Sequence, residues 1–273
     1  TTFHGNYSAN SKLKINYNSI KAHGDRVIAI SQYIRDQLYD RYGVSPAKIR
    51  VIPRGVDTKF FDPSAVSAQR IIQLSKRWRL PDDASVIMLP GRLTRWKGQG
   101  VMIKALSLMK DHKNLRCIFV GSEQGHTRYG RELRREIQKR GLVSNFHFTG
   151  HCSDMPAAFM LSDVVVSTST EAEAFGRVIV EAQAMGRPVI ATNHGAACET
   201  ISPGNTGWLV PPNDENVLSA ALLKALAMEP NSRQTIAQKS MKHVRENYTK
   251  EQMCESTMDV YKEILMQKMS HGG

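Results

Sequence analysis

The fold is decided by the stretch Ser167-Thr-Ser-Thr-Glu171-Ala-Glu173-Ala-Phe175-Gly176-Arg177-Val-Ile-Val-Glu181-Ala-Gln-Ala-Met-Gly186. It follows the apolar run Val164-Val-Val166, which is typical of a strand buried on both faces. A polar loop comes next, and a largely apolar helix is predicted from near Phe175. A strand that passes through a loop into a helix is one unit of a parallel α/β sheet.

The same alternation extends along the chain on both sides of this unit. Ser31 is the expected cap of a helix that runs to about Tyr42, and helix is expected to dominate from Asp214 to the end. The sequence Phe60-Phe-Asp-Pro-Ser64 indicates a linker. Strands are expected at 26–30 and 50–53 before this linker, and at 85–89, 115–120, 145–149, 164–167, 188–191 and 207–210 after it.

These elements predict an α/β chain with one complete and one partial domain. Six strands with intervening helices make a complete, doubly wound Rossmann-like domain, whereas the residues before the linker supply about three strands, or half of one. We expect residues 1–62 to end an N-terminal Rossmann-like domain, 63–248 to form a complete one, and 249–273 to be a C-terminal helix. Because the sequence starts at Thr1 and not at methionine, we expect it to be part of a longer chain.

The composition excludes several classes of protein. With 41% hydrophobic and 23% charged residues among 273, it is that of a globular protein. No window approaches the roughly 20 apolar residues that span a bilayer, and the start has no signal-peptide pattern. The cysteines have no metal-ligand spacing, so no metal site is expected and a reducing cytoplasm fits them: Cys117, Cys152, Cys198 and Cys254.

A formal net charge of +12 leaves the class of partner open. The charge could serve solubility, an anionic substrate, a membrane surface or a nucleic acid. Nucleic acid has the least support, because no RNA-binding aromatic motif, recognition helix or zinc finger is present. Basic residues recur along the whole chain, so charge alone does not decide among the others.

A loop with several basic residues follows the strand expected at 85–89. Gly91 turns the chain, and Arg92 and Lys97 lie on the way to the next helix. In an open parallel sheet, ligands bind outside the carboxyl ends of the strands. An arginine fork and a lysine ammonium suit a diphosphate. Taken alone, this loop fits a solvated surface equally well.

The opening stretch carries a stronger signal. Free backbone N–H groups at the start of its helix favour an anion, and Gly176 leaves that backbone open to a ligand. Glu173 lies just before the helix and Glu181 two turns along it, where both could accept hydrogen bonds from sugar hydroxyls. Glu173 could instead simply complement the helix dipole. That explanation does not cover Glu181, which lies among apolar residues where an unpaired carboxylate is costly.

Three further turns end strands of the same sheet. Gly121, Gly150 and the segment 193–196 are expected to ring the crevice, although each alone is little more than a turn signal. Glu199 follows the third turn, and a plain surface charge is at least as well supported there as a function.

In this combination the chain resembles glycosyltransferase family 4, a large family of retaining, nucleotide-sugar-dependent enzymes with the two-domain GT-B fold. The two glutamates have the family's E-x7-E spacing. The landmarks span nearly the whole chain in one order: Val51-Ile-Pro-Arg-Gly55-Val-Asp57, Gly91-Arg92 with Lys97-Gly98, Phe148-Thr-Gly150, Glu173-Ala-Phe-Gly176 through Glu181, Gly186-Arg-Pro-Val189 and Gly207-Trp-Leu-Val210.

The resemblance implies a role for each matching residue. Arg92 and Lys97 would bind the donor diphosphate and stabilise it as it leaves, in place of a metal ion. Glu173 would contact the transferred sugar, and Glu181 would hold the nucleotide ribose. The donor-binding set would be completed by residues of the same crevice, of which Phe175 and Gly176 would offer backbone contacts: Gly91, Gly121, Gly150, Phe175, Gly176 and Arg177.

The chain departs from the family at its front. A GT-B enzyme has two Rossmann-like domains and binds the acceptor mostly on the first, of which this sequence holds only the end. Thr2-Phe3-His4-Gly5 resembles the family's strand end that carries an active-site histidine beside the donor sugar, so His4 is the candidate. The last helix resembles one that crosses back to the N-terminal domain in relatives.

The resulting hypothesis is a retaining glycosyltransferase that moves a sugar from a nucleotide-diphosphate sugar to a glycan or glycolipid acceptor, in envelope glycan or lipopolysaccharide synthesis. It would use no cofactor, and UDP, GDP and ADP donors stay open. A non-catalytic nucleotide-sugar-binding fragment and a GT-B nucleotide-sugar epimerase are the alternatives. A nicotinamide oxidoreductase is disfavoured, because no Gly-x-Gly-x-x-Gly follows a strand. The expected location is cytoplasmic, with peripheral contact to anionic lipid on the inner face of the cytoplasmic membrane.

Overall fold

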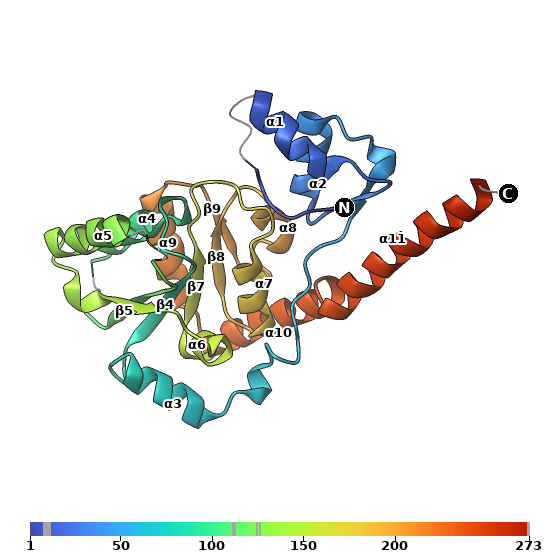
Figure 1. Cartoon of the computed structure of the whole chain (residues 1–273). Coiled ribbons are helices and arrows are strands. Elements are labelled where there is room, and N and C mark those ends of the chain that lie inside the picture. Colours follow the sequence, from blue (N-terminus) through green and yellow to red (C-terminus); the bar gives the residue numbers. More distant parts are fainter. Residues whose placement is uncertain (8–11, 111–112, 124, 126, 272–273) are drawn as a thin grey trace.

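The computed structural model describes residues 1–7, 12–110, 113–123, 125 and 127–271, which form two parallel sheets flanked by helices (Figure 1). The smaller sheet has the strand order β1-β2-β3 and the larger the order β6-β5-β4-β7-β8-β9. The strands are β1 (Thr2–Phe3), β2 (Val27–Ala29), β3 (Ile49–Val51), β4 (Ser85–Pro90), β5 (Leu115–Val120), β6 (Phe146–Gly150), β7 (Val164–Ser167), β8 (Val189–Thr192) and β9 (Trp208–Val210). The predicted α/β class is confirmed.

The helices lie between the strands and after the last one. They are α1 (Lys12–Ser19), α2 (Gln32–Tyr42), α3 (Ala68–Arg77), α4 (Gln99–Ser107), α5 (Thr127–Lys139), α6 (Met155–Leu161), α7 (Arg177–Ala184), α8 (Ala197–Thr200), α9 (Glu215–Leu226), α10 (Pro230–Asn247) and α11 (Lys250–His271). No helix of the described residues combines the length and the apolar character needed to cross a membrane.

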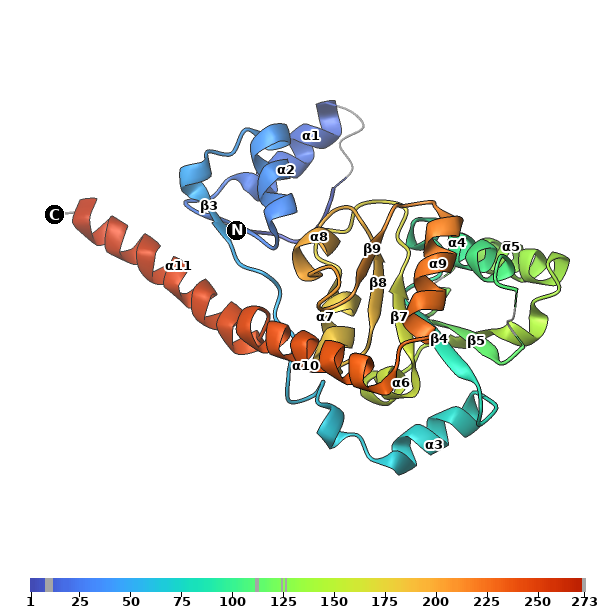
Figure 2. The same ribbon diagram turned by 180° about the vertical axis from the view of Figure 1, so that it is seen from behind.

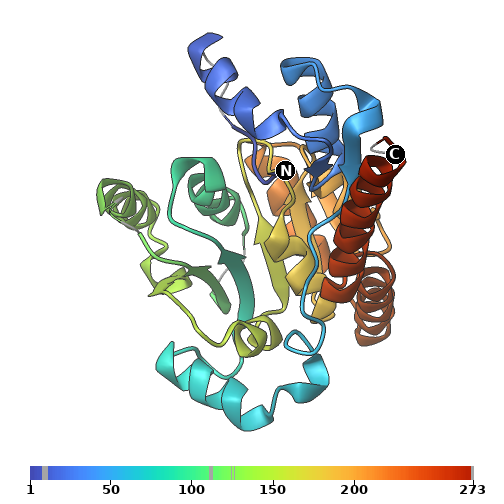
Figure 3. The same ribbon diagram turned by 45° about the vertical axis from the view of Figure 1, so that its right-hand side comes forward.

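The six-stranded sheet is buried on both faces because its side chains alternate. Ile87 and Phe119 pack into one apolar cluster together with residues of α4 and α9. Met88 and Ile118, one position away on the same strands, join a second cluster with residues of α6 and α7. Figure 3 shows α4 and α5, in green, on one side of this sheet and α11, in dark red, beyond the other. This two-sided burial explains the continuous apolar runs in the sequence.

The strand order places a switch point between β4 and β7. Each strand is parallel to its neighbours, and the chain moves outward from β4 to β6 in one direction and from β7 to β9 in the other. In such sheets the ligand crevice lies outside the carboxyl ends of the strands at the point of reversal. The loops that follow β4 and β7 therefore form the expected crevice.

The three-stranded sheet carries its own helices. Ser31 caps α2, its side chain accepting a hydrogen bond from the backbone N–H of Ile34 at 3.1 Å. On the other side, Val260 of α11 packs with Ile28 and Ile52, and Glu263 accepts hydrogen bonds from Arg26 and Arg50. Figure 2 shows α11 continuing from α10 past this sheet. The helix that follows the larger sheet thus returns to the smaller one.

A shared apolar cluster joins the two sheets. Phe175 and Val180, from the loop and helix after β7, pack in the same cluster as Phe3 and Ile34 of the N-terminal residues. Tyr248, at the end of α10, completes the contact with its ring 5.9 Å from that of Phe175. The domain boundaries predicted at 62 and 248 stay predictions, since the packing is continuous across them.

Candidate functional site

The loops after β4 and β7 are clamped together at the switch point. The hydroxyl of Thr168 donates hydrogen bonds to the carbonyls of Lys97 and Gly98 at 3.0 and 3.1 Å. The backbone N–H of Thr170 donates to the carbonyl of Trp96 at 2.7 Å. Gly98 has φ 72°, and a Cβ there would lie 1.9 Å from the carbonyl oxygen of Thr168. Only glycine permits this approach, which fixes the start of α4 against the β7 loop.

Lys97 and Glu173 form an ion pair in the crevice. The ammonium Nζ lies 2.7 Å from Oε1 of Glu173, and the side chains are 14% and 16% exposed. Ser169 donates a short hydrogen bond to the same oxygen, and Ser167 donates one at 3.3 Å. Oε2 is left without a hydrogen-bond partner among the described residues. The structure therefore brings together two of the residues predicted to act on the donor.

The exit of β8 supports the backbone of Glu173. The backbone N–H of Ala196 donates to the carbonyl of Glu173 at 3.0 Å, and a Cβ on Gly195 would lie 2.5 Å from that oxygen. His194 Nε2 and the hydroxyl of Thr192 each lie 2.9 Å from the carbonyl oxygen of Ser169. The segment predicted at 193–196 thus borders the site by holding its main loop in place.

Helix α7 presents an open N-terminus to the same crevice. It begins at Arg177, close to the predicted start near Phe175, and Gly176 is its N-cap residue with a left-handed φ of 78°. No side chain caps this end, so the first backbone N–H groups can serve an anion. The ring of Phe175 points instead into the shared apolar cluster, where its side chain fastens the loop.

Glu181 is the most perturbed acidic group near the site. Its side chain is 15% exposed, its nearest cation is Arg177 at 3.8 Å, and no hydrogen-bond donor among the described residues reaches it. Burial raises the pKa of Glu181 to about 7, and the charge of Arg177 opposes that rise. A buried carboxylate that lacks hydrogen-bond donors is a group that ligand hydroxyls could satisfy.

Three glycine turns line up at the ends of β4, β5 and β6. A Cβ on Gly121 would lie 2.1 Å from the carbonyl oxygen of Gly91, and the N–H of Gly121 donates to the carbonyl of Gly150 at 2.9 Å. The side chain of Arg92 is exposed and has no hydrogen-bond or ion-pair partner among the described residues. Its backbone is fixed, because the amide of the fully buried Gln99 donates to its carbonyl at 2.9 Å. Arg92 is thus anchored while its guanidinium stays available.

His4 lies at the carboxyl end of β1, and its side chain contacts Arg54, whose Nη1 lies 2.9 Å from Nδ1 of His4. Burial lowers the pKa of His4, and Arg54 adds to the effect. The pKa of Arg54 is lowered by burial and by the charge of Arg177. The described residues show no hydrogen bond or ion pair between His4 and Lys97 or Glu173, so the predicted histidine is not in direct polar contact with that pair.

Sequence reasoning missed residues that hold the site. Ser167 and Ser169 are within the quoted stretch, where a run of hydroxyl residues before Glu173 was the available signal. Glu199 is not a plain surface charge: its carboxylate accepts hydrogen bonds from the backbone N–H groups of Gln32 and Tyr33 at 2.8 and 2.7 Å. These are the first N–H groups of α2, so Glu199 joins the two sheets beside the site.

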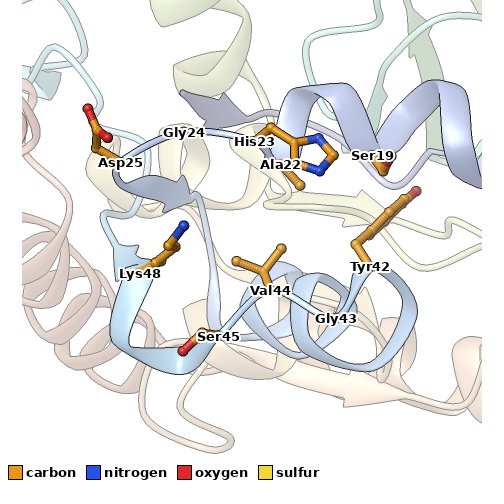
Figure 4. Close-up of a pocket in the computed structure, with 10 residues that line it drawn as sticks. All are labelled: Ser19, Ala22, His23, Gly24, Asp25, Tyr42, Gly43, Val44, Ser45 and Lys48. Carbon is orange, nitrogen blue, oxygen red and sulfur yellow. The ribbon is translucent and has the colours of Figure 1, made fainter.

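One pocket lies beside the crevice, and another lies away from it in the three-stranded part. A pocket of about 500 Å³ adjoins the crevice and is lined by Thr94, Arg95, Trp96, Gly125, Arg128, Tyr129 and Glu171. A pocket of about 590 Å³ lies in the three-stranded part, between the segment before β2 and the end of α2 (Figure 4). The second pocket contains none of the predicted site residues.

Comparison with known proteins identifies the family. Residues 71–243 match the model of the family Glycosyl transferases group 1, and residues 1–60 match that of Glycosyltransferase Family 4. The D-inositol 3-phosphate glycosyltransferase of Kribbella flavida is 29% identical over 230 residues, which are 81% of this chain and 52% of that protein. The chain spans about half the length of the curated relatives it matches in this group.

Solved structures give the same result for the fold. A glycosyltransferase from Rickettsia africae ESF-5 is 34% identical and superposes with a TM-score of 0.90, over 97% of this chain and 70% of that chain. Anabaena Alr3699/HepE in complex with UDP-glucose is 27% identical with a TM-score of 0.84, over 94% of this chain and 71% of that chain. The GT-B prediction and the resemblance to this family are confirmed.

Proposed function

Because the chain belongs to the group 1 glycosyl transferases, we propose that it binds the donor of a retaining glycosyltransferase and transfers its sugar to an acceptor hydroxyl. The observation that carries the proposal is the Lys97–Glu173 pair at the switch point, beside the uncapped start of α7. It combines a cation and free amides for a diphosphate with a carboxylate for sugar hydroxyls.

Each side chain has a task in this proposal. Lys97, Arg92 and the first N–H groups of α7 bind the diphosphate. Oε2 of Glu173 accepts a hydrogen bond from the transferred sugar. Glu181 accepts hydrogen bonds from the ribose hydroxyls, which would offset the cost of its burial. The turns at Gly91, Gly121 and Gly150 let the ligand approach backbone atoms closely.

The chemistry is a substitution at the anomeric carbon with retention. The bond between that carbon and the diphosphate oxygen breaks, and Lys97 and Arg92 stabilise the charge that develops on the leaving group. The acceptor hydroxyl attacks from the same face, and its proton passes to an oxygen of the departing phosphate. No metal ion is required in this scheme, because the two basic side chains take its place.

The donor is proposed to be a UDP-hexose. The support is the likeness to HepE, whose solved structures contain UDP, UDP with glucose, and UDP-glucose. An acceptor in envelope glycan or lipopolysaccharide synthesis, reached from the cytoplasmic side of a membrane, is the matching proposal for the net charge of +12. Vesicles with anionic lipid should then bind the protein better than neutral vesicles in a sedimentation assay. Equal binding to both would contradict the proposed contact with the membrane.

A second candidate is a nucleotide-sugar-binding module without turnover. It is favoured by one observation, namely that Lys97, Glu173 and Glu181 all lie on loops and a helix of the larger sheet, so that donor binding there does not by itself require turnover. Incubation with UDP-glucose and candidate acceptors distinguishes the two. Release of UDP with formation of an α-linked product supports the transferase, whereas saturable binding without turnover supports the module.

Calorimetric titration with UDP-, GDP- and ADP-sugars tests the donor site directly. We expect saturable binding that a chelator does not change and that Lys97→Met weakens by roughly 10- to 100-fold, the range of a charge-assisted contact. Lys139→Met, which removes an exposed lysine at the end of α5, serves as the matched control. The proposal fails if the folded chain binds none of the donors, or if both variants bind equally well.

A further inference from the structure

His4 and Arg54 follow β1 and β3, the two outer strands of the three-stranded sheet, and the backbone of each is held in place. His4 follows Phe3, which is 1% exposed and packs its ring 4.8 Å from that of Tyr7 and 5.2 Å from that of Tyr42. The backbone at His4 therefore cannot shift without disturbing this aromatic cluster.

The segment around Arg54 is clamped from the other side. A Cβ on Gly55 would lie 2.5 Å from the Cα of Lys250, and the N–H of Val56 donates to the carbonyl of Tyr248 at 2.8 Å. Lys250 Nζ also lies 2.6 Å from the carboxylate of Asp57. Arg54 thus extends from a short segment that is fastened to the junction of α10 and α11.

The contact between the two side chains allows one arrangement of protons. A guanidinium carries only hydrogen-bond donors and stays protonated in proteins. Nδ1 of His4, 2.9 Å from Nη1 of Arg54, must therefore be the acceptor. A neutral imidazole that accepts at Nδ1 carries its proton at Nε2. Protonation at Nδ1 would set two donors against each other and break the contact.

We propose that Arg54 is a positioning residue that fixes His4 as the neutral tautomer protonated at Nε2. His4 then acts on the substrate as a hydrogen-bond donor through Nε2 and not as a general base. This step rests on the proposed function, because it assumes that the histidine faces the donor sugar. The assignment of the tautomer itself needs no ligand.

The surroundings of the pair support the neutral state. Burial and the charge of Arg54 both lower the pKa of His4. The charged groups that bear on the pair are Arg54, from the exit of β3, and Arg177, from the start of α7. No carboxylate of the described residues is hydrogen-bonded or ion-paired with His4. Arg54 is thus the charged neighbour of the imidazole, and its positive charge favours the uncharged form of His4.

Long-range proton–nitrogen NMR of the imidazole rings tests the proposal on the ligand-free chain. The two ring nitrogens of His4, assigned by loss of its signals in His4→Gln, should show the Nε2-protonated form at neutral pH. Arg54→Met should move both nitrogen signals toward a tautomer average and raise the titration midpoint toward the ordinary value of about 6.5. Arg54→Lys, which keeps a charged donor, should retain most of the parent signature.

His194 provides the internal control. Its Nε2 lies 2.9 Å from the carbonyl oxygen of Ser169, which can only accept, so His194 should show the same tautomer in every variant. Unchanged His194 signals establish that each variant is folded. The proposal is overturned if His4 of the parent carries its proton at Nδ1, or if the parent and Arg54→Met give the same spectra. Calorimetric titration of the same samples with UDP-glucose tests the donor site separately, so either idea can fail alone.

Discussion

Replacing Glu181 by glutamine should stabilise the ligand-free chain in alkaline solution and weaken donor binding. The carboxylate is 15% exposed, has Arg177 at 3.8 Å as its nearest cation, and has a pKa raised by burial to about 7. Glutamine keeps the size of the side chain and removes the charge. The change therefore isolates the cost of holding an ionised group in this position.

The magnitude follows from the pKa values of Glu181 in the two states. Below the ordinary value of 4.5 the carboxyl group is protonated in the folded and the unfolded chain, and it adds no penalty. Between 4.5 and about 7 the folded chain holds the proton more tightly, so stability falls as the pH rises. Above about 7 the full penalty is present, about 3 kcal/mol at 1.36 kcal/mol for each pKa unit.

Urea denaturation at pH 5 and pH 8.5 measures this term. The gain in unfolding free energy from Glu181→Gln should be about 2–3 kcal/mol larger at pH 8.5 than at pH 5. Glu255→Gln, at an exposed position of α11, is the control and should give the same small effect at both pH values. Other titrating groups cancel in the comparison. An equal effect of Glu181→Gln at the two pH values would refute the reasoning.

Three further changes test the framework of the site. Gly98→Ala places a side chain on a left-handed backbone against Thr168, and it should lower the unfolding free energy in urea by more than about 2 kcal/mol. Gly141→Ala is the control and should cost less, because Gly141 is also left-handed but has no neighbour within 4 Å. Glu199→Ala removes the acceptor for the first N–H groups of α2 and should cost about 1–2 kcal/mol by the same measurement, with faster hydrogen exchange at Gln32 and Tyr33. The guanidinium groups of Arg50 and Arg26 lower the pKa of Glu263 to about 2. In thermal melts, Glu263→Gln should therefore lower the melting temperature above pH 4.5, and this effect should disappear as the pH falls toward 2.

Local signals in the sequence were sufficient for most of the elements. The apolar runs of β4, β5 and β7 are buried on both faces, and each was predicted within one residue of its ends. The cap at Ser31 was predictable because a serine before a helical period can satisfy the first N–H groups without help from elsewhere. The start of α7 was predicted near Phe175, and the left-handed backbone at Gly176 sets it at Arg177.

Contacts between distant segments were not predictable in the same way. Glu199 caps a helix more than 160 positions earlier in the chain, and no local pattern distinguishes such a carboxylate from a solvated one. The partner of His4 is likewise 50 positions away, on a strand that is not its immediate neighbour. Phe175 was expected to offer backbone contacts, and its side chain, for which no position was predicted, lies in the cluster that joins the two sheets. Each case depends on tertiary packing, which the spacing of residues does not encode.

In the donor complex that we propose, the contacts of Glu173 would keep its carboxylate oriented. A diphosphate would draw Lys97 away from the carboxylate, because a doubly charged group attracts the ammonium more strongly than a single carboxylate does. The two serine hydroxyls would remain on Oε1, and the exit of β8 would still hold the backbone. Oε2 would then face the sugar from a position that the protein, not the ligand, has fixed. Glu173 would therefore need little reorganisation on donor binding. The free-energy cost of a prearranged charge would instead arise at the buried Glu181, and the comparison of Glu181→Gln at pH 5 and pH 8.5 measures that cost.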